Sequence, residues 1–322
     1  MAGVEQKTVD SDESGMRLDR WFKTHYPGLG FGRLQKLLRS GQIRLDGGRA
    51  KADTRIQPGQ TIRVPPLDAE KPTSAAKSTN ASDAERLSAM LIYEDPKVFV
   101  FNKPAGLAVQ GGSGVARHVD GMLEAWRNKR GEKPRLVHRL DRDTSGVLVV
   151  ARTRQAAQRL TAAFRERATE KVYWALVKGA PGKKEGRIST WLVKETTPDG
   201  DRMRVAKHGE PDADHAVSYY RVIEQAGQNL SWLEMQPYTG RTHQLRVHAA
   251  HLDCPIIGDP KYFEADQNWD FPGGLQNKLH LHARRIVIPH PDGKGTVDVT
   301  APLPPHMVQS WNLLGFDKDH AE

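Results

Sequence analysis

Asp141 and Asp143 lie in a dense polar cluster of the sequence, residues 138–146. An apolar run at 147–150 follows directly and predicts a buried strand. Reactive side chains are often found where a loop is held by a rigid strand. A carboxylate in such a loop could attack as a nucleophile or stabilise a developing positive charge. From these residues alone a solvated turn is an equal alternative, because charged turns are abundant.

Two further segments carry residues that could take part in chemistry. In residues 238–248, Gly240 and Thr242 predict a turn into a helix, which would place Arg246 within its first turns. In residues 170–177, alternation places Tyr173 on the opposite face of a strand from its neighbours. Taken alone, these segments are better interpreted as a helix with a solvated basic face and as a core tyrosine with a satisfied hydroxyl.

The segments that must position these residues read as a large domain over residues 85–322. Apolar runs predict strands, and a helical pattern predicts a helix over residues 154–164. The predicted strands are 98–101, 147–150, 172–177, 217–222 and 286–288. We therefore expect an α+β or α/β domain built on one large sheet.

A small unit precedes this domain. Apolar residues at helical spacing predict two helices, the first with Trp21 and the second with Leu34, followed by two short strands that end near Val64. We assign a compact α/β unit to 16–66 and a polar tail to 1–15. Residues 67–84 are rich in Pro, Ala, Ser, Thr and Lys and predict a flexible linker.

Charge indicates the class of partner. The chain of 322 residues has 48 Lys and Arg against 39 Asp and Glu, a net charge of +9. Residues 16–65 alone hold eleven Lys or Arg against three Asp. Such a surplus favours a polyanion, such as nucleic acid. Arg20, Arg33, Lys36 and Arg39 lie outside the apolar helix positions, so we expect them on an exposed basic face.

The cysteine count and the lack of long apolar runs bear on the cellular location. Cys254 is the only cysteine and cannot form an internal disulfide. No run approaches the roughly 18 apolar residues of a membrane helix, and the first fifteen residues lack the apolar core of a signal peptide. We expect a cytoplasmic protein with no membrane association.

Several motifs in order resemble one family. Residues 102–106 (Asn-Lys-Pro-Ala-Gly), 138–146, 171–176, 240–248 and 281–283 (Leu-His-Ala) are similar to motifs of the RluA/RluC/RluD family of RNA pseudouridine synthases. The resemblance implies an α+β catalytic domain over 85–322 with a large mixed, mainly antiparallel sheet.

The N-terminal unit and one loop refine this resemblance. Residues 16–66 resemble the small RNA-binding domain of ribosomal small-subunit protein four. Residues 110–114 are most similar to the C-type enzymes of the large ribosomal subunit, although Gln110 stands where we expect histidine. The implied substrate is large-subunit (23S) ribosomal RNA or the assembling large subunit.

The resemblance also assigns roles. It implies that Asp141 is the catalytic carboxylate, that Arg246 pairs with it, and that Tyr173 stacks on the target base. It implies that Arg139 enters the RNA near the flipped nucleotide. Two alternatives stay open: the same chemistry on another structured RNA such as tRNA, or a non-catalytic RNA-binding assembly factor. A binding factor could dispense with Asp141, Tyr173 and Arg246, so their presence favours the enzyme.

The implied reaction sets further expectations. Isomerisation breaks the C1′–N1 bond of uridine and rejoins the sugar to C5, so no electrons leave and no group is transferred. We expect no cofactor and no metal, and a monomer without an obligate protein partner. His248 with His251, and His280 with His282, could in principle bind a metal, but solvated or core histidines are the stronger interpretation. A glycosidase-like pair of Asp141 and Asp143 is disfavoured, because such carboxylates must flank a sugar bond.

Overall fold

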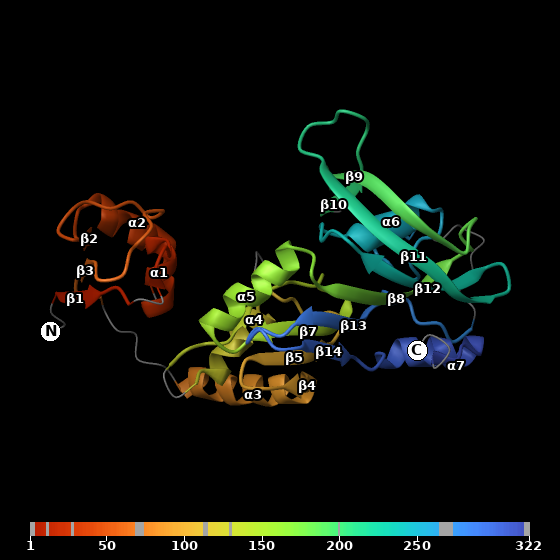
Figure 1. Cartoon of the computed structure of the whole chain (residues 1–322), viewed down its shortest axis with the longest axis horizontal. Helices are drawn as coiled ribbons and strands as arrows, with labels where there is room; N and C mark the ends of the chain where they lie inside the picture. The colour runs from red at the N-terminus through yellow and green to blue at the C-terminus, as the bar shows by residue number, and fades with distance from the viewer. Residues whose placement is uncertain are drawn as a thin grey trace. The chain divides into compact units, whose positions relative to one another are not determined.

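The computed structural model describes residues 4–10, 13–26, 29–67, 74–111, 115–128, 131–198, 200–263 and 273–318. The chain divides into two compact units, Met1–Ser78 and Thr79–Glu322 (Figure 1). The division falls inside the stretch 67–84 that the sequence marks as a linker. None of the helices in the described ranges is both long and apolar enough to cross a membrane.

The N-terminal unit contains two amphipathic helices and a three-stranded antiparallel sheet of order β1-β3-β2. Its elements are β1 (Glu5–Thr8), α1 (Leu18–His25), α2 (Phe31–Arg39), β2 (Arg44–Leu45) and β3 (Thr61–Val64). Trp21, Phe22 and Leu34 are buried in one core, as their spacing predicts. Gly41, with φ of +70°, ends α2 in the left-handed conformation that glycine adopts readily.

The predicted polar tail, 1–15, and the predicted linker, 67–84, each contain regular structure that the sequence did not predict. Residues 5–8 of the predicted polar tail form β1, whose residues are all exposed, so backbone pairing with β3 and not an apolar pattern makes the strand. Residues 74–84 of the predicted linker belong to helix α3 (Ser74–Met90). Alanine favours this helix, and Leu87 and Met90 pack its end into the core of the second unit.

The second unit is built on an eleven-stranded sheet of order β10-β9-β11-β12-β8-β13-β7-β5-β4, with β14 beside β13 and β6 beside β7. Its strands are β4 (Leu91–Glu94), β5 (Val98–Lys103), β6 (Arg135–Leu136), β7 (Ser145–Ala151), β8 (Glu170–Lys178), β9 (Glu185–Thr197), β10 (Gly200–Val205), β11 (Asp214–Ala226), β12 (Leu230–Pro237), β13 (Leu281–Pro289) and β14 (Thr296–Thr300). The pair β13 and β7 is parallel, and the other described pairs are antiparallel. The expected mixed, mainly antiparallel α+β fold is confirmed.

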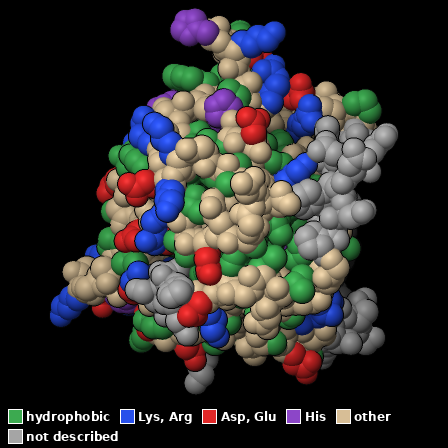
Figure 2. All heavy atoms as spheres, turned by 90° about the vertical axis from the view of Figure 1, so that its right-hand side faces the viewer, with side chains coloured by type: hydrophobic (Ala, Val, Ile, Leu, Met, Phe, Trp, Pro, Cys, Tyr) green, Lys and Arg blue, Asp and Glu red, His purple; other side chains and the backbone are tan. Residues whose placement is uncertain are grey.

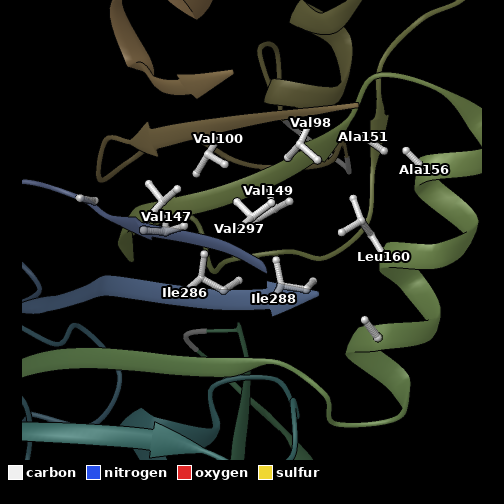
Figure 3. Packing of buried hydrophobic residues seen from close by; sticks show 13 residues of the cluster. Val98, Val100, Val147, Val149, Ala151, Ala156, Leu160, Ile286, Ile288 and Val297 are labelled. Carbon is white, nitrogen blue, oxygen red and sulfur yellow. The ribbon is translucent and has the colours of Figure 1, made fainter. Parts of the chain in front are cut away.

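Helices cover both faces of this sheet. They are α3, α4 (Val119–Met122) with a 3-10 turn at Leu123–Trp126, α5 (Arg154–Arg165), α6 (Gln244–His251) and α7 (Pro305–Leu314). Strand β7 is buried along its whole length. Val147 and Val149 face α5 (Figure 3), whereas Leu148 and Val150 face the core that contains Leu87. Burial on both faces explains the continuous apolar run.

The surface is mixed in character. On the side of the molecule that carries β11, β12 and α7, apolar side chains are exposed among Lys and Arg side chains (Figure 2). Such exposure of single apolar residues is ordinary on a folded protein.

Gly146 is required where the loop 138–146 enters β7. Its φ is +108°, and an added Cβ would lie 2.2 Å from the backbone oxygen of Ala283 on β13. This close approach allows the parallel pairing of β7 with β13, in which Gly146 lies opposite Ala283. The backbone at the entrance to the loop therefore tolerates no side chain.

We predict that Gly146→Ala lowers the free energy of unfolding by more than about 2 kcal/mol, because the methyl group forces β7 and β13 apart. Urea denaturation monitored by circular dichroism measures the change. Gly182→Ala is the matched control, since no atom lies within 4 Å of a Cβ there. Equal stability of the two variants would contradict the assigned close approach.

Candidate active site

A pocket of about 570 Å³ opens where the loop 137–144, the start of β8 and the segment 237–246 meet. Its lining includes Asp141, Tyr173, Arg246 and Arg139, which come from distant segments of the sequence. The volume is typical of a pocket for a small organic group. The structure therefore brings the predicted catalytic residues and Arg139 together at one site.

Asp141 lies in a loop that is fastened to the segment after β5. The Lys103 ammonium donates hydrogen bonds to the carbonyl oxygens of Pro104 (2.9 Å), Leu107 (2.9 Å) and Arg142 (3.0 Å). The amide of Gly106 also donates to the Arg142 carbonyl at 2.9 Å. These bonds fix the backbone immediately after Asp141.

Lys103 is fully buried, although it is a lysine at the end of a strand. Burial lowers its pKa to about 7, and the charges of Asp143 and Asp141 oppose that shift. Its three carbonyl acceptors use the three donors of an ammonium group. The motif at 102–106 thus supplies the lysine whose hydrogen bonds connect the segment after β5 with the loop 138–146.

Arg246 makes its hydrogen bonds to Asp259 and not to Asp141. The Nε and Nη2 atoms of Arg246 donate to the two carboxylate oxygens of Asp259 at 2.7 and 2.6 Å. The Nη1 atom lies 3.8 Å from Oδ2 of Asp141, which is an ion pair without a hydrogen bond. The predicted pairing with Asp141 is therefore present in a looser form, and the stronger partner, Asp259, was not predicted.

Burial and pairing act in opposite directions on Arg246. Its side chain is 3% exposed, and that of Asp259 is 0% exposed. Burial lowers the pKa of Arg246, but its hydrogen bonds and charge interaction with Asp259 raise it, and the net pKa is raised. A bidentate pair fixes the plane of the guanidinium. The Nη1 edge is thereby held toward Asp141.

Asp259 is itself held in place by the backbone around it. Gly258 has φ of +70°, and a Cβ there would lie 2.0 Å from the Lys278 carbonyl oxygen. Oδ1 of Asp259 also accepts hydrogen bonds from the amides of Lys261 (2.9 Å) and Tyr262 (3.2 Å). The available sequence signal was a Gly-Asp pair directly after the apolar residues 256–257, where a turn leaves a buried run.

Tyr262 and His243 complete the support of Arg246. The Arg246 guanidinium lies 5.1 Å from the centre of the Tyr262 ring. The Tyr262 hydroxyl accepts a hydrogen bond from the Met203 amide (2.8 Å) and lies 2.9 Å from Nδ1 of His243. His243 precedes α6 with φ of +52°, a rare conformation for a residue with a side chain. It lines the pocket, and burial lowers its pKa, whereas Asp141 opposes that shift.

Tyr173 lies on β8 with its side chain on the face predicted by alternation. It packs with two apolar cores, whereas Trp174 belongs to the core on the other side of the sheet. Burial, and to a smaller extent the charge of Asp141, raises the pKa of the Tyr173 hydroxyl. The Tyr173 side chain therefore lines the pocket with its hydroxyl in the protonated form.

The pocket is strongly cationic. Asp141 is the one carboxylate among the described residues that line it. The cationic lining residues are Arg139, Arg165, Arg167, Lys171, Arg241 and Arg246. Burial, with the nearby charge of Arg167, lowers the pKa of Lys171. A single carboxylate among cations suits a substrate that carries phosphates.

The remaining predicted contacts lie elsewhere. Arg20 is exposed on α1, and Arg33, Lys36 and Arg39 are exposed on α2, all within the N-terminal unit. Three residues of the predicted loop 110–114, namely 112–114, lie outside the described residues.

The histidines considered as metal ligands have other partners. His248 contacts the hydroxyls of Thr190 (3.0 Å) and Ser218 (2.9 Å). His280 lies 2.7 Å from the Ser310 hydroxyl, and His282 lies 2.9 Å from that of Ser145. In the described ranges no three His, Cys, Asp or Glu gather as a possible metal group. These three histidines are core residues with satisfied rings, whereas His251 is exposed.

Residues 97–251 match the family model described as RNA pseudouridylate synthase. The chain is 35% identical over 321 residues to "Ribosomal large subunit pseudouridine synthase C" of Pasteurella multocida, covering 98% of this chain and 95% of that protein. The chain belongs to the RNA pseudouridylate synthase family.

Other members agree with this assignment. "RNA pseudouridine synthase 4, mitochondrial" of Arabidopsis thaliana is 35% identical, covering 94% of this chain and 80% of the relative. The solved structure of human "RNA Pseudouridylate Synthase Domain Containing 4" is similar with a TM-score of 0.62 and 29% identity, covering 74% of this chain and 97% of that chain. These likenesses confirm the sequence-based resemblance and the synthase fold.

We predict that Asp259→Asn lowers the free energy of unfolding by about 3–5 kcal/mol, because Arg246 would remain buried without its charged partner. Urea denaturation measures the loss. Asp298→Asn is the control, since its pair with Arg285 is exposed and contributes about 0–1 kcal/mol. Equal losses for the two variants would contradict the role of Asp259 as the main partner of Arg246.

We also predict that Lys103→Met destabilises the protein by about 1–3 kcal/mol, because three backbone carbonyl groups lose the hydrogen bond from the Lys103 ammonium. The loop 138–146 should then exchange its amide hydrogens faster than in the wild type, which hydrogen exchange with mass spectrometry can measure. Lys183→Met, at an exposed lysine of the same unit, is the control. Unchanged exchange in the loop would show that Lys103 does not hold it.

Proposed function

We propose that this protein isomerises specific uridines to pseudouridine in large-subunit ribosomal RNA, with Asp141 as the catalytic carboxylate. The single observation that carries the assignment is Asp141 as the sole carboxylate among the described lining residues of a cationic pocket. The relatives named as synthases of the large ribosomal subunit support this substrate, since the alignment spans nearly the whole chain.

The geometry fits the chemistry of this isomerisation. An ionised carboxylate can attack the substrate covalently or stabilise the positive charge that develops on the sugar when C1′–N1 breaks. Arg246 contributes a fixed positive charge 3.8 Å from Asp141, and Asp259 keeps the guanidinium oriented. The reaction is neutral in electrons and transfers no group, so in our proposal it proceeds without a cofactor or metal.

The detached uracil must turn before C5 bonds to C1′. The Tyr173 ring at the pocket gives the base a stacking surface, worth about 1–3 kcal/mol for such contacts. Because the pKa of its hydroxyl is raised, the group is protonated and can donate a hydrogen bond to a uracil oxygen. Tyr173 thus holds the base within the pocket while it rotates.

The target uridine must leave its helix to reach this pocket, at a cost of a few kcal/mol. Arg139 is exposed at the pocket rim and can occupy the space that the nucleotide vacates. Arg20, Arg33, Lys36 and Arg39 supply phosphate contacts from the N-terminal unit, which set affinity more than chemistry. In this proposal the protein works as a monomer in the cytoplasm on 23S ribosomal RNA or an assembling large subunit.

The decisive experiment compares Asp141→Asn with Asp143→Asn on unmodified large-subunit ribosomal RNA. We expect Asp141→Asn to lower the single-turnover rate by at least about 10⁴-fold, because the reacting carboxylate is gone while the shape stays nearly the same. Asp143 lines a neighbouring cavity and does not line the pocket of Asp141, so Asp143→Asn should keep most of the activity. Pseudouridine is counted by mass spectrometry of RNA digests.

The outcomes separate the alternatives. Retention of substantial turnover by Asp141→Asn would reject its catalytic role. If the wild type modifies transfer RNA and leaves ribosomal RNA unmodified, the chemistry stands and the substrate is wrong. If the wild type binds ribosomal RNA without forming pseudouridine, a non-catalytic assembly factor is the better description.

A further inference from the structure

The part of the pocket between the end of α5 and the start of β8 carries charge of one sign. Arg165 is the last residue of α5, Arg167 lies in the loop that follows, and Lys171 is the second residue of β8. All three side chains line the pocket. Among the described residues, none of the three has an acidic partner in an ion pair. This part of the pocket therefore has an excess of positive charge that an anionic ligand can neutralise.

Lys171 is the most buried of these cations, and its side chain lies near the base-stacking tyrosine. It comes two residues before Tyr173 on β8, so the two side chains point to the same face of the sheet, about 7 Å apart along the strand. Burial lowers the pKa of Lys171, and the charge of Arg167 lowers it further. An anion bound beside Lys171 would oppose both effects, because an opposite charge favours the ammonium form.

Arg167 is held at the rim of the pocket by a contact with a distant segment. Its φ is +61°, a conformation that few residues with a side chain adopt. Its guanidinium lies 4.5 Å from the centre of the Tyr238 ring, which also lines the pocket. This cation–π contact joins the loop after α5 to the segment after β12 and limits the freedom of the guanidinium.

His138 contributes an uncharged donor whose tautomer is fixed by the fold. The backbone amide of Val149 donates a hydrogen bond to Nε2 of His138 at 2.8 Å. Because an amide N–H can only donate, Nε2 carries the lone pair and the ring proton lies on Nδ1. Burial lowers the pKa of His138 to about 3, and the charge of Lys171 acts in the same direction. The ring is therefore neutral at neutral pH.

The Nδ1–H group of His138 is available to a ligand. The ring stacks on Phe164, with the ring centres 4.5 Å apart, and it lines the pocket. In the described ranges Nδ1 has no acceptor, and the atom is accessible to solvent. The electrostatic effect of Lys171 on this ring places the two side chains close together. A neutral N–H beside cations can donate to an anion without adding a further charge.

From these contacts we propose that His138, Lys171 and Arg167 bind one backbone phosphate of the nucleotide that enters the pocket. The identity of that nucleotide rests on the proposed function. Its phosphate is separated from its base by the sugar alone, and Lys171 is separated from Tyr173 by one residue of β8, so one nucleotide can contact both. Lys171 and Arg167 supply charge, and His138 supplies a directed hydrogen bond. Contacts at the phosphate would keep the sugar in place while the uracil turns.

The first test uses the full-length wild type with ¹⁵N-labelled histidine and two probes, uridine 3′,5′-bisphosphate and uridine. NMR at neutral pH should show His138 with its proton on Nδ1, the signal being assigned by its loss in His138→Gln. The bisphosphate should shift the Nδ1 resonance, whereas the same concentration of uridine should not, because uridine has no phosphate. A charged ring, a proton on Nε2, or equal shifts with both probes would overturn the proposal.

The second test separates the charged group from the neutral one by salt dependence. Single-turnover reactions on an unmodified large-subunit ribosomal RNA transcript give the protein concentration for half-maximal rate at several salt concentrations. In Lys171→Met this concentration should rise roughly 10- to 100-fold, and the slope of its logarithm against log salt should fall by about 1, as for loss of one phosphate contact. Lys183→Met removes an exposed lysine outside the pocket lining and is the charge-matched control, with no expected change in either quantity.

His138→Gln should behave differently from Lys171→Met. Its side-chain carbonyl can still accept from the Val149 amide, but the donor at Nδ1 is lost. Half-saturation should rise about 10-fold with an unchanged salt slope, because a neutral group releases no counterion.

The remaining outcomes are also decisive. An unchanged salt slope and half-saturation in Lys171→Met would overturn the phosphate site. If His138→Gln does not fold, as judged by circular dichroism, Lys171→Met keeps the test, because it should abolish the histidine shift caused by the bisphosphate. If the wild type forms no pseudouridine, the proposed function fails, and the NMR comparison of the two probes still decides whether these residues bind phosphate.

Discussion

The structure of the site depends on one buried interaction, the two-pronged pair between Arg246 and Asp259. Leaving a guanidinium in a nearly dry position is costly unless its charge is matched and its donors are used. Asp259 meets both needs and leaves the Nη1 edge for Asp141. The arginine is therefore a fixed source of positive charge beside Asp141. A flexible arginine on the surface could not hold this geometry, because it would lose much of its interaction to water.

A second buried cation fixes the other side of the site. Lys103 holds the loop that carries Asp141 by donating hydrogen bonds to three backbone carbonyl groups. These bonds stabilise the loop although none of them is to a carboxylate. Gly146, at the end of the loop 138–146, and Gly258, directly before Asp259, allow the backbone to approach a neighbouring segment closely. The positions of Asp141 and Arg246 thus depend on close backbone contacts that glycine permits and residues with a side chain do not. This rigidity suits a reaction in which the base must turn while the sugar stays in place.

The basic residues of the two units suit different contacts with RNA. Basic residues on α1 and α2 are exposed and suited to phosphates, whereas the cations at the pocket surround one carboxylate. RNA recognition in this proposal combines long-range attraction, which is screened by salt, with contacts of short range that position the target.

The sequence by itself determined the family, the α+β class and the main strands, because motifs and apolar periodicity are local properties of the chain. It also selected Asp141, Tyr173 and Arg246 as candidate site residues, and the structure places all three at one pocket. It failed for β1, whose exposed residues carry no apolar pattern, and for the helical part of the predicted linker, which tertiary packing of Leu87 and Met90 supports. Only the tertiary structure decided that Arg246 is held by Asp259, thirteen residues away. Ion pairing between buried side chains depends on how α6 and the following turn meet in space, and no local pattern encodes that distance.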